Sequence, residues 1–371
     1  MSNIQQLIEI SRYYGDNPAY VIAGGGNTSV KDKEQIWIKA SGIPLEGISE
    51  RGFVCLSREK LGEIEVNTYS EDSVAREEQV KSDMQRAIIS PENLRPSVET
   101  SLHNLIDYTY VIHTHPTLVN GLMCSNHTEE EVETRFGSDA LYVEYTDPGF
   151  ILFKKVQERI VQYREQFGKA PAIIFLQNHG VFVGANGVDE IRSIYDSINK
   201  RIGSGIENSL PKCDIEAYDS NTAKVIKNHY ASRGLISKSV HCELIDQFSG
   251  SKEQYLKIAL PFSPDIIVYC KSNYLFLEES MEADQVMAAC EQFEQTHGYY
   301  PKVIIEEKGG LIAVEEKERS VHNVLDVFLD AMKISFLSEN FGGPHFMTAE
   351  QIQFIDNWEV EHYRRKVAKD T

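Results

Sequence analysis

The clearest chemical signal in the sequence comes from His113 and His115, which lie two residues apart near the end of a β-rich run. Side chains at positions i and i+2 of a strand point to the same face, so these two imidazoles can bind one metal ion. His179 stands in a predicted tight turn immediately before Gly180, and Glu99 lies on a predicted helix that leads into the strand. Three histidines and a nearby carboxylate leave a coordination position open, which is typical of a catalytic metal site.

A second candidate element is the glycine-rich sequence Gly-Gly-Gly-Asn-Thr-Ser at residues 24–29, which follows a short β-rich run. Glycines let the backbone approach a ligand closely, and Asn27 and the two hydroxyls after it can donate hydrogen bonds to an anion. The sequence matches neither the GxGxxG nor the Walker pattern. Taken alone, it is explained equally well by a glycine-rich hairpin that binds nothing.

Hydrophobic periodicity predicts the elements that position these residues. Short β-rich runs at 110–113, 172–176 and 181–184 predict strands around the histidines. Apolar residues at helical spacing from 153 to 167 predict an amphipathic helix, with Asp147 as its N-cap and Pro148 as its first residue. We therefore expect an α/β fold, in which strands and helices alternate.

The second half of the chain is expected to form a smaller α/β domain without a metal site. Residues 1–205 are expected to form the catalytic domain, the polar segment 206–250 a connector, and residues 251–371 the C-terminal domain. In that domain the sequence predicts strands at 266–269, 303–306 and 311–314 and helices at 281–293 and about 321–337. A final helix is expected to open at Thr348, with Gln351 completing a capping box.

The sequence also contains a weak internal similarity. Residues 171–198 and 301–328 each contain a proline, an apolar strand, a turn with glycine, a second strand and a helix. The second segment has Gly309 where the first has His179, and residues 264–271 faintly resemble residues 109–116 without their histidines. Two unrelated units of this kind can look alike by chance; a degenerate repeat that has lost its site explains the pattern equally well.

Composition limits the partners of the protein. The 371 residues include 37 Lys and Arg and 56 Asp and Glu, which gives a formal charge of −19. Without a basic cluster, nucleic acids and anionic membranes are poor partners, and an anionic substrate must be bound by backbone amides, hydroxyls or a metal. Six scattered cysteines and the lack of an apolar stretch of about 18 residues lead us to expect a reduced, cytoplasmic protein.

Five stretches between residues 20 and 200 resemble, in order, motifs of the class II aldolase/adducin family: GGGNTS, IKASGIP, RPSVETSLH, VIHTHP and LQNHGVFV. The resemblance implies a three-layer α/β/α domain, commonly in a ring-shaped tetramer, so we expect a homo-oligomer. By motif, the family's Zn²⁺ ligands fall on His113, His115 and His179, and its acid/base glutamate falls on Glu99. The family's phosphate-binding positions fall on Asn27, Ser41, Gly42 and Ser97.

The match has departures. One type of family member has a second serine at the position of Val98, so one phosphate donor is missing here. The family also takes a catalytic tyrosine from a neighbouring subunit, for which Tyr142 and Tyr145 are candidates, although an ordinary core or surface tyrosine is the better explanation for either.

The C-terminal half resembles the part that follows the aldolase domain in bifunctional rhamnulose-1-phosphate aldolase/dehydrogenase proteins. The matching stretches are SPDIIVYCK, KVIIEEKGGLIAVEEKE and AEQIQFIDNWEVEHYRRKVA, and no Rossmann strand-GxGxxG-helix unit follows them. We therefore expect zinc, or another divalent metal, to support cleavage of a rhamnulose 1-phosphate-like ketose 1-phosphate. The alternatives are a sugar-phosphate 4-epimerase, another carbonyl reaction such as decarboxylation, and a non-catalytic adducin-like interaction protein.

Overall fold

The computed structural model of the protein describes residues 2–357 and contains two units. The first unit comprises Met1–Met123 and His127–Gly205, and the second comprises Cys124–Asn126 and the chain from Ile206 onward. None of the helices in the described part of the chain is long and apolar enough to cross a membrane.

The first unit contains one mixed sheet. Its strands are β1 (Asn27–Lys31), β2 (Gln35–Lys39), β3 (Phe53–Ser57), β4 (Ile88–Ser90), β5 (Tyr110–Thr114), β6 (Leu141–Val143), β7 (Ile173–Leu176) and β8 (Gly180–Ala185). Their order across the sheet is β4-β3-β2-β1-β5-β8-β7-β6. Neighbouring strands are antiparallel except β6 and β7, which are parallel. The strands that flank the predicted histidines are therefore adjacent.

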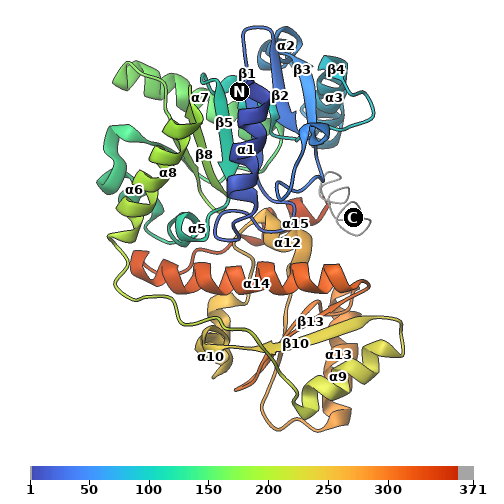
Figure 1. The fold of residues 1–371 in the computed structure, drawn as a ribbon. Coiled ribbons are helices and arrows are strands. Elements are labelled where there is room, and N and C mark those ends of the chain that lie inside the picture. The colour runs from blue at the N-terminus through green and yellow to red at the C-terminus, as the bar shows by residue number, and fades with distance from the viewer. Residues whose placement is uncertain (1, 358–371) are drawn as a thin grey trace. The chain divides into compact units, whose positions relative to one another are not determined.

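Helices cover both faces of this sheet (Figure 1). They are α1 (Asn3–Gly15), α2 (Arg58–Val66), α3 (Ser73–Ala87), α4 (Thr100–Leu105), α5 (Thr117–Met123), α6 (Thr128–Phe136), α7 (Phe150–Phe167) and α8 (Val188–Gly203). Helices α1, α5 and α8 contact β1 and β8 on one face. Helices α2, α3, α4 and α7 pack on the other face. The first unit thus has the three-layer α/β/α fold that the sequence resemblance implies.

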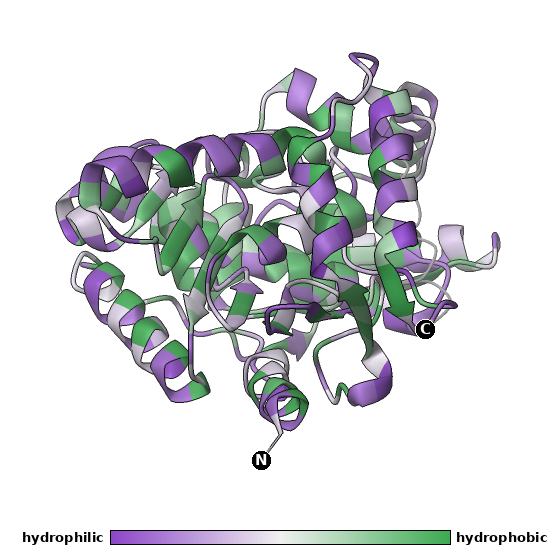
Figure 2. Cartoon of the chain, turned by 90° about the horizontal axis from the view of Figure 1, so that it is seen from above, coloured by the Kyte–Doolittle hydropathy of each residue, from purple (hydrophilic) through white to green (hydrophobic). Residues whose placement is uncertain are grey.

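Alternation along the strands sends apolar side chains into both layers. In β8, Phe182 belongs to the core formed with α4 and α7, and the period of two places Val181 and Val183 on the opposite face. All three side chains are at most 1% exposed. Figure 2 shows the same pattern, with hydrophobic strands surrounded by helices whose residues alternate between hydrophobic and hydrophilic. Dense packing on both faces supports the residues at the strand ends.

The second unit contains a smaller sheet. Its strands are β9 (Glu216–Ala217), β10 (Ile236–His241), β11 (Leu275–Leu277), β12 (Val303–Glu306) and β13 (Leu311–Glu315), in the order β11-β12-β13-β10-β9. Its helices are α9 (Asn221–Ala231), α10 (Glu243–Ser249), α11 (Lys252–Tyr255), α12 (Pro264–Cys270), α13 (Ala283–His297), α14 (Glu318–Ser338) and α15 (Ala349–Asn357). It is the C-terminal α/β domain that the sequence predicts.

The second sheet reproduces five strands of the first. The order β11-β12-β13-β10-β9 corresponds to β6-β7-β8-β5-β1. In each set the first two strands are parallel and the remaining neighbours are antiparallel. The parallel strands are joined by a long helix, α13 or α7, and the next strand is followed by α14 or α8. The internal similarity between residues 171–198 and 301–328 therefore extends over a whole five-stranded sheet.

The turns that join β7 to β8 and β12 to β13 have the same backbone geometry. Asn178 and Lys308 occupy equivalent positions, and both have a φ of 54°, in the left-handed region. Two residues later, a Cβ atom at Gly180 would lie 2.6 Å from a backbone carbonyl oxygen of β5. A Cβ atom at Gly310 would lie 2.7 Å from a backbone carbonyl oxygen of β10. The close approach of two backbones requires glycine at both positions.

Strand register identifies the corresponding residues of the two units. Thr114 lies opposite Val181 in the first sheet, and Val240 lies opposite Leu311 in the second. Counting from these pairs and from the two turns, the counterparts of His113, His115 and His179 are Ser239, His241 and Gly309. One of the three predicted metal ligands therefore has a histidine as its counterpart.

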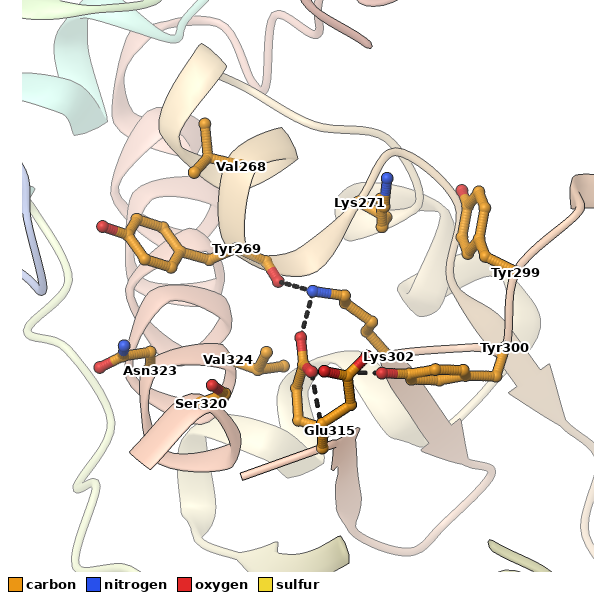
Figure 3. A pocket seen from close by; sticks show the side chains of 11 residues that line it. Val268, Tyr269, Lys271, Tyr299, Tyr300, Lys302, Glu315, Ser320, Asn323 and Val324 are labelled. Carbon is orange, nitrogen blue, oxygen red and sulfur yellow. Dashed lines mark hydrogen bonds and ion pairs between the residues drawn. The ribbon is translucent and has the colours of Figure 1, made fainter. Parts of the chain in front are cut away.

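The two units also differ at the opposite ends of these strands, where β12 begins and β13 ends in the second unit. In the second unit a cavity of about 240 Å³ is lined by residues of α12, α14, β13 and the segment before β12 (Figure 3). Glu315, which is 2% exposed, forms an ion pair there with Lys302 and accepts a hydrogen bond from the Tyr300 hydroxyl at 3.2 Å. The equivalent positions in the first unit are Ala172 and Ala185. The buried ion pair is thus a feature that the second unit does not share with the first.

Residues 206–250 are not the connector that their polarity predicts. They contain β9, α9, β10 and α10, and β10 lies between β13 and β9 in the sheet. Five of the six residues of β10 are only half-buried, which explains why a strand in this position carries so many polar side chains. The second unit accordingly starts near residue 206 instead of 251.

The strand expected at residues 266–269 is also wrong, because this segment belongs to helix α12. Ser263 is its N-cap and Pro264 its first residue, a combination that favours a helix start. The apolar residues that follow are all buried, so the segment lacks the periodicity that separates a short helix from a strand. The counterpart of β5 is β10, and the faint similarity of residues 264–271 to 109–116 is accidental.

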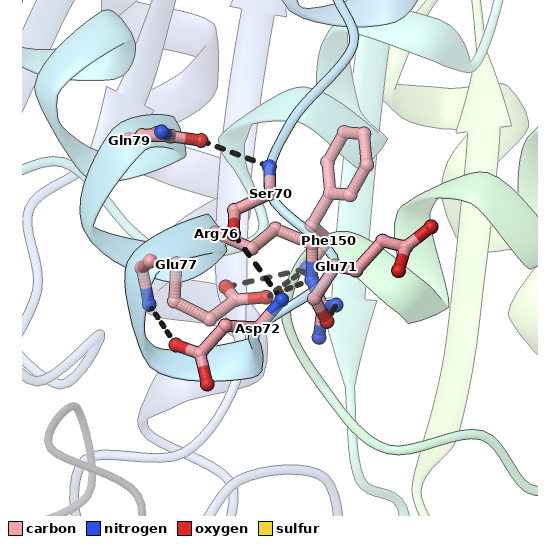
Figure 4. Close-up of polar contacts among 8 residues, drawn as sticks. Ser70, Glu71, Asp72, Arg76, Glu77, Gln79 and Phe150 are labelled. Atoms are coloured by element: carbon pink, nitrogen blue, oxygen red, sulfur yellow. Dashed lines mark hydrogen bonds and ion pairs between the residues drawn. The ribbon is translucent and has the colours of Figure 1, made fainter.

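Helix α7 begins two residues later than predicted. Its N-cap is Gly149 instead of Asp147, and its first residue is Phe150 instead of Pro148. The Phe150 N–H points at both carboxylate oxygens of Glu77 on α3, at 3.2 and 3.4 Å (Figure 4). A side chain of another helix therefore accepts the first free N–H group of α7. The sequence around residue 150 does not reveal this partner.

The capping box predicted at the start of the final helix is confirmed. The Thr348 N–H donates to Gln351 Oε1 at 2.8 Å, and the Gln351 N–H donates to Thr348 Oγ1 at 3.3 Å. Helix α15 follows, and the rest of the C-terminal stretch quoted above, from residue 358, lies outside the described residues.

Candidate metal and catalytic site

Three histidines converge at the end of β5. His113 belongs to the strand and His115 follows it, and their ring centroids are 4.7 Å apart. His179, in the turn between β7 and β8, has its ring centroid 5.0 Å from that of His113 and 5.2 Å from that of His115. One ring nitrogen of each lies within 4.8 Å of the other two. The structure thus brings together the three residues predicted as metal ligands.

The turn at Asn178 places His179 in this cluster. The left-handed φ of Asn178 turns the chain, and its N–H donates to the Met123 carbonyl at 3.0 Å. A Cβ atom at Gly180 would also lie 2.7 Å from Cδ2 of His115, so a larger residue would displace that ring. The sequence Asn-His-Gly therefore fixes both the turn and the packing of two of the imidazoles.

His113 is the most buried member of the cluster. Its side chain is stacked on Phe182, with ring centroids 4.0 Å apart and an interplanar angle of 16°. His113 Nδ1 lies 3.0 Å from the Val181 carbonyl oxygen, which can only accept, so Nδ1 carries the proton and the lone pair of Nε2 faces the cluster. Burial lowers the pKa of His113 well below its usual range, which keeps the imidazole in the neutral form that binds metals.

Glu99 completes the cluster from the start of α4. Its Oε1 lies 3.5 Å from His113 Nε2 and 3.4 Å from His179 Nε2. This oxygen is buried and accepts no hydrogen bond from the described residues. Burial raises the pKa of Glu99, but the neighbouring imidazoles and the Asn27 amide outweigh burial and bring the pKa to about 2. A buried, ionised oxygen and three imidazole nitrogens around one point fit a divalent metal ion.

Three of the four expected phosphate-binding residues lie on two neighbouring segments. Ala40 pairs with Pro96 in a β-bridge, and the Ser41 N–H donates to the carbonyl oxygen of the residue before Pro96 at 2.8 Å. Gly42 follows with a φ of 82°. Ser97 Oγ accepts the Glu99 N–H at 3.3 Å, so this serine lies next to the backbone of Glu99.

Asn27 has a contact that the sequence did not predict. Its Nδ2 donates to Glu99 Oε2 at 2.5 Å, and its Oδ1 contacts Nε2 of His103. The glycine-rich sequence before it is also tightly packed, because a Cβ atom at Gly26 would lie 2.8 Å from the carbonyl oxygen of His113. The glycine therefore allows β1 to approach β5, the strand that carries His113.

His103 is the buried residue that sequence reasoning missed. It is fully buried on α4, and its Nδ1 lies 2.8 Å from Ser29 Oγ. It comes four residues after Glu99, so the two residues occupy the same side of a helix, and this spacing was the available signal.

The two candidate tyrosines have other partners. The Tyr142 hydroxyl donates to Gln177 Oε1 at 2.8 Å, and the Tyr145 hydroxyl lies 3.3 Å from Asp147 Oδ1. Burial raises the pKa of both hydroxyls. Within this chain they stabilise the segment after β6.

The family description "Class II Aldolase and Adducin N-terminal domain" matches residues 5–200. This range contains every candidate site residue described above. The "Uncharacterized oxidoreductase YuxG" of Bacillus subtilis is 26% identical over 187 residues, which are 48% of this chain and 26% of that protein. The chain therefore matches only about a quarter of that relative's length.

Two further proteins each match about half of the chain. The "L-fuculose phosphate aldolase" of Methanocaldococcus jannaschii is 28% identical over 186 residues, or 48% of this chain and 81% of that protein. A solved structure described as the N-terminal class II aldolase domain of a conserved protein from Thermoplasma acidophilum covers 55% of this chain and 93% of its own, with 25% identity and a TM-score of 0.46.

Proposed function

Because the chain belongs to the class II aldolase and adducin family, we propose that it is a metal-dependent aldehyde-lyase that cleaves a ketose 1-phosphate. The products would be dihydroxyacetone phosphate and an aldehyde, with a rhamnulose 1-phosphate-like substrate. The observation that supports this proposal is the convergence of three imidazoles with the buried carboxylate of Glu99. A protein that only binds partners has no use for this arrangement. The name of the Methanocaldococcus relative supports a sugar-phosphate substrate.

We assign the metal position to His113, His115 and His179, and the metal to Zn²⁺ or another divalent ion that accepts nitrogen ligands. When bound, the metal supplies a Lewis acid that stabilises negative charge on the substrate oxygens. The neutral imidazole of His113 and its bond to the Val181 carbonyl hold one ligand nitrogen in position.

Glu99 would move the proton of the reaction. The C3–C4 bond breaks, its electron pair stays on C3, and the C4 hydroxyl loses its proton as C4 becomes the aldehyde carbon. The proton that the C4 hydroxyl loses passes to water. Glu99, which is ionised before the step, would take up a proton from water and deliver it to C3, and it would remove this proton from C3 in the reverse direction, so that protons balance over the reaction. Because Oε2 is bonded to Asn27, Oε1 is the oxygen that performs this transfer.

We propose that the phosphate binds where residues 41–42 meet Ser97, with Asn27 nearby. The Lys39 ammonium donates to the Ile43 carbonyl at 2.7 Å and lies 3.5 Å from the Gly24 carbonyl, between this segment and the glycine-rich loop. A positive charge at this position favours an anion locally, although the protein as a whole carries a charge of −19.

We further propose a cytoplasmic homo-oligomer. The family resemblance, in which tetramers are common and a tyrosine comes from a neighbouring subunit, supports this assembly. Light scattering of the purified protein measures the number of subunits.

The test is the release of dihydroxyacetone phosphate from rhamnulose 1-phosphate by protein of known zinc content. The product is followed by coupled reduction with NADH, and Glu99→Gln is the matched control. We expect release that requires both zinc and Glu99. No release from zinc-loaded protein, with fuculose 1-phosphate and ribulose 1-phosphate also unreactive, would refute the proposal. An epimerase would convert the sugar without releasing either half.

A further inference from the structure

A chain of buried polar contacts lies behind Glu99. Ser29 Oγ is 2.8 Å from Nδ1 of His103, and Nε2 of His103 contacts Oδ1 of Asn27. Asn27 Nδ2 then lies 2.5 Å from Oε2 of Glu99. Ser29, Asn27 and His103 are each at most 5% exposed, so water does not compete for these hydrogen bonds. The contacts connect a β1 hydroxyl to the candidate catalytic carboxylate.

The chemistry of the partners determines where each proton lies. The Glu99 carboxylate can only accept, so the Asn27 amide must point its NH₂ toward Glu99 and its oxygen toward His103. Nε2 of His103 must therefore carry the proton. Nδ1 is then the acceptor, and the Ser29 hydroxyl donates to it. Burial lowers the pKa of His103 to about 3, which is consistent with a neutral imidazole.

Strand β1 also holds the helix that begins at Glu99. Side chains two residues apart on a strand share a face, so Asn27, Ser29 and Lys31 all point toward α4. The Lys31 ammonium donates to the carbonyl oxygens of His103 and Ile106 at 2.5 Å each. The helix is thus fixed at its C-terminal end by Lys31 and in its middle by Ser29, which leaves the Asn27 amide to set the carboxylate orientation.

We propose that His103 is a positioning residue that locks the Asn27 amide and thereby aims Oε1 of Glu99 at the three histidines. With Nε2–H in place, the amide presents only its NH₂ to Glu99, and Oε2 is held away from the substrate. Without this donor the amide can rotate and place its oxygen against the carboxylate, which repels Glu99 from its position. The inference rests on the proposed function for its kinetic consequence but not for its structural one.

Two substitutions of His103 separate the contribution of its Nε2–H donor from the contribution of its packing. Gln places an amide nitrogen close to the position of His Nε2 and keeps the donor, whereas Leu has a similar size and no donor. We expect His103→Leu to lower kcat by about 10–100-fold, as outer partners of a metal site do, with KM and bound zinc changed less than about twofold. His103→Gln is expected to restore most of kcat.

Asn104→Ala is the matched control, because Asn104 is a buried polar residue of the same short helix whose partners are Arg58 and Glu65. We expect it to lower stability without changing kcat of the folded, zinc-loaded protein. Ser29→Ala provides a second approach if His103→Leu does not fold. It removes the hydroxyl that selects the tautomer, and we expect a smaller fall in kcat, of about 3–10-fold.

The structural readout does not depend on catalysis. Crystal structures and the side-chain amide resonances of Asn27 report whether the Asn27–Glu99 hydrogen bond is present. We expect this bond in the wild type and in His103→Gln, and its loss in His103→Leu. If the bond and kcat both persist in His103→Leu, the inference is wrong. If the bond behaves as expected while the wild type cleaves none of the ketose phosphates, the inference stands and the proposed function fails.

Discussion

The two units share a sheet topology and a turn geometry but differ in the side chains at the same positions. Where the first unit has His113, His115 and His179, the second has Ser239, His241 and Gly309. The glycine after each turn and the left-handed residue before it are present in both units. The backbone frame of the site is therefore a property of the fold, whereas its chemistry depends on three side chains.

An aromatic ring fills the corresponding space in the second unit. Tyr218 lies opposite Ser239, at the position of Asn27 in the first sheet. A Cβ atom at Gly310 would lie 2.5 Å from Cδ1 of Tyr218. The Tyr218 ring is also stacked on His241, with centroids 5.7 Å apart. The position of Asn27, whose amide donates to Glu99 in the first unit, therefore holds an aromatic ring in the second unit.

The remaining histidine of the second unit has a different partner. His241 Nε2 lies 2.8 Å from Asp246 Oδ1 on α10. This unit instead concentrates polar chemistry at the far ends of its strands, where Lys302 and Glu315 form the buried ion pair. A sheet topology shared by the two units therefore does not imply a shared site.

The largest effect is expected from His179→Ala. It removes one of three metal ligands, so bound zinc should fall from about one per chain toward zero and activity by about 1,000-fold or more. The matched control is His241→Ala, which should change neither quantity, because its Nε2 faces Asp246. Elemental analysis and the cleavage assay measure both. Two metal ions per wild-type chain, or metal loss in His241→Ala, would contradict the comparison.

Alanine at the two turn glycines should separate the effect of the turn on stability from its effect on zinc binding. In Gly180→Ala and Gly310→Ala the new Cβ meets a backbone carbonyl oxygen at 2.6 and 2.7 Å, so each should lower stability by about 1–3 kcal/mol. Only Gly180→Ala should also weaken zinc binding, because it displaces His115. Gly62→Ala on α2, where nothing lies within 4 Å, should instead stabilise by about 0.5–1 kcal/mol. Urea unfolding measures the stability of each variant, and zinc titration measures its zinc affinity. Equal zinc affinity in Gly180→Ala and Gly310→Ala would contradict the expectation that only the first of these turns supports a metal ligand.

The buried ion pair should matter for stability and not for catalysis. Lys302→Met leaves Glu315 buried without its partner and should cost about 3–5 kcal/mol. The double variant Lys302→Met with Glu315→Leu should recover most of this loss, because apolar pairs replace buried ion pairs at little cost. Chemical denaturation measures both, and kcat should stay unchanged. If the double variant is as unstable as Lys302→Met, the ion pair must contribute to stability by more than the mutual neutralisation of its two charges.

The smallest effect concerns the crossover helices α7 and α13. Helix α13 carries its own capping box, in which the Glu282 N–H donates to Gln285 Oε1 at 2.8 Å, whereas α7 depends on Glu77 from α3. Glu77→Ala and Gln285→Ala should each cost about 1 kcal/mol.

Only the Glu77 cap should depend on pH. Burial raises the pKa of Glu77, so the folded protein holds this proton more tightly than the unfolded chain does. Its contribution to stability should therefore fall as pH rises above the ordinary glutamate range. Glu77→Gln should remove this dependence, and unfolding curves at several pH values measure it. A pH dependence that persists in Glu77→Gln must come from another group.

The sequence predicted those features that local patterns encode. The strand spacing of His113 and His115, the turn before Gly180 and the capping box at Thr348 each depend on neighbouring residues, and the structure places them as expected. The family motifs added the α/β/α fold and placed Glu99 beside the histidines.

Features that depend on distant residues could not be predicted. The cap of α7 comes from Glu77, and the hydrogen-bond partners of the His103 ring are β1 residues more than seventy positions away. Helix α12 was misassigned because burial on all sides removes periodicity. Strand β10 was overlooked because its partial burial leaves it polar.

The most direct test of the central claim is hydrogen exchange of dihydroxyacetone phosphate alone in D₂O, followed by proton NMR. If the zinc-loaded protein generates negative charge at C3 and Glu99 transfers the proton, one of the two C3 hydrogens should be replaced by deuterium. The exchange should disappear in Glu99→Gln and after zinc removal, and it should persist in His241→Ala. No exchange by zinc-loaded wild-type protein, or exchange that does not require Glu99, would contradict the account.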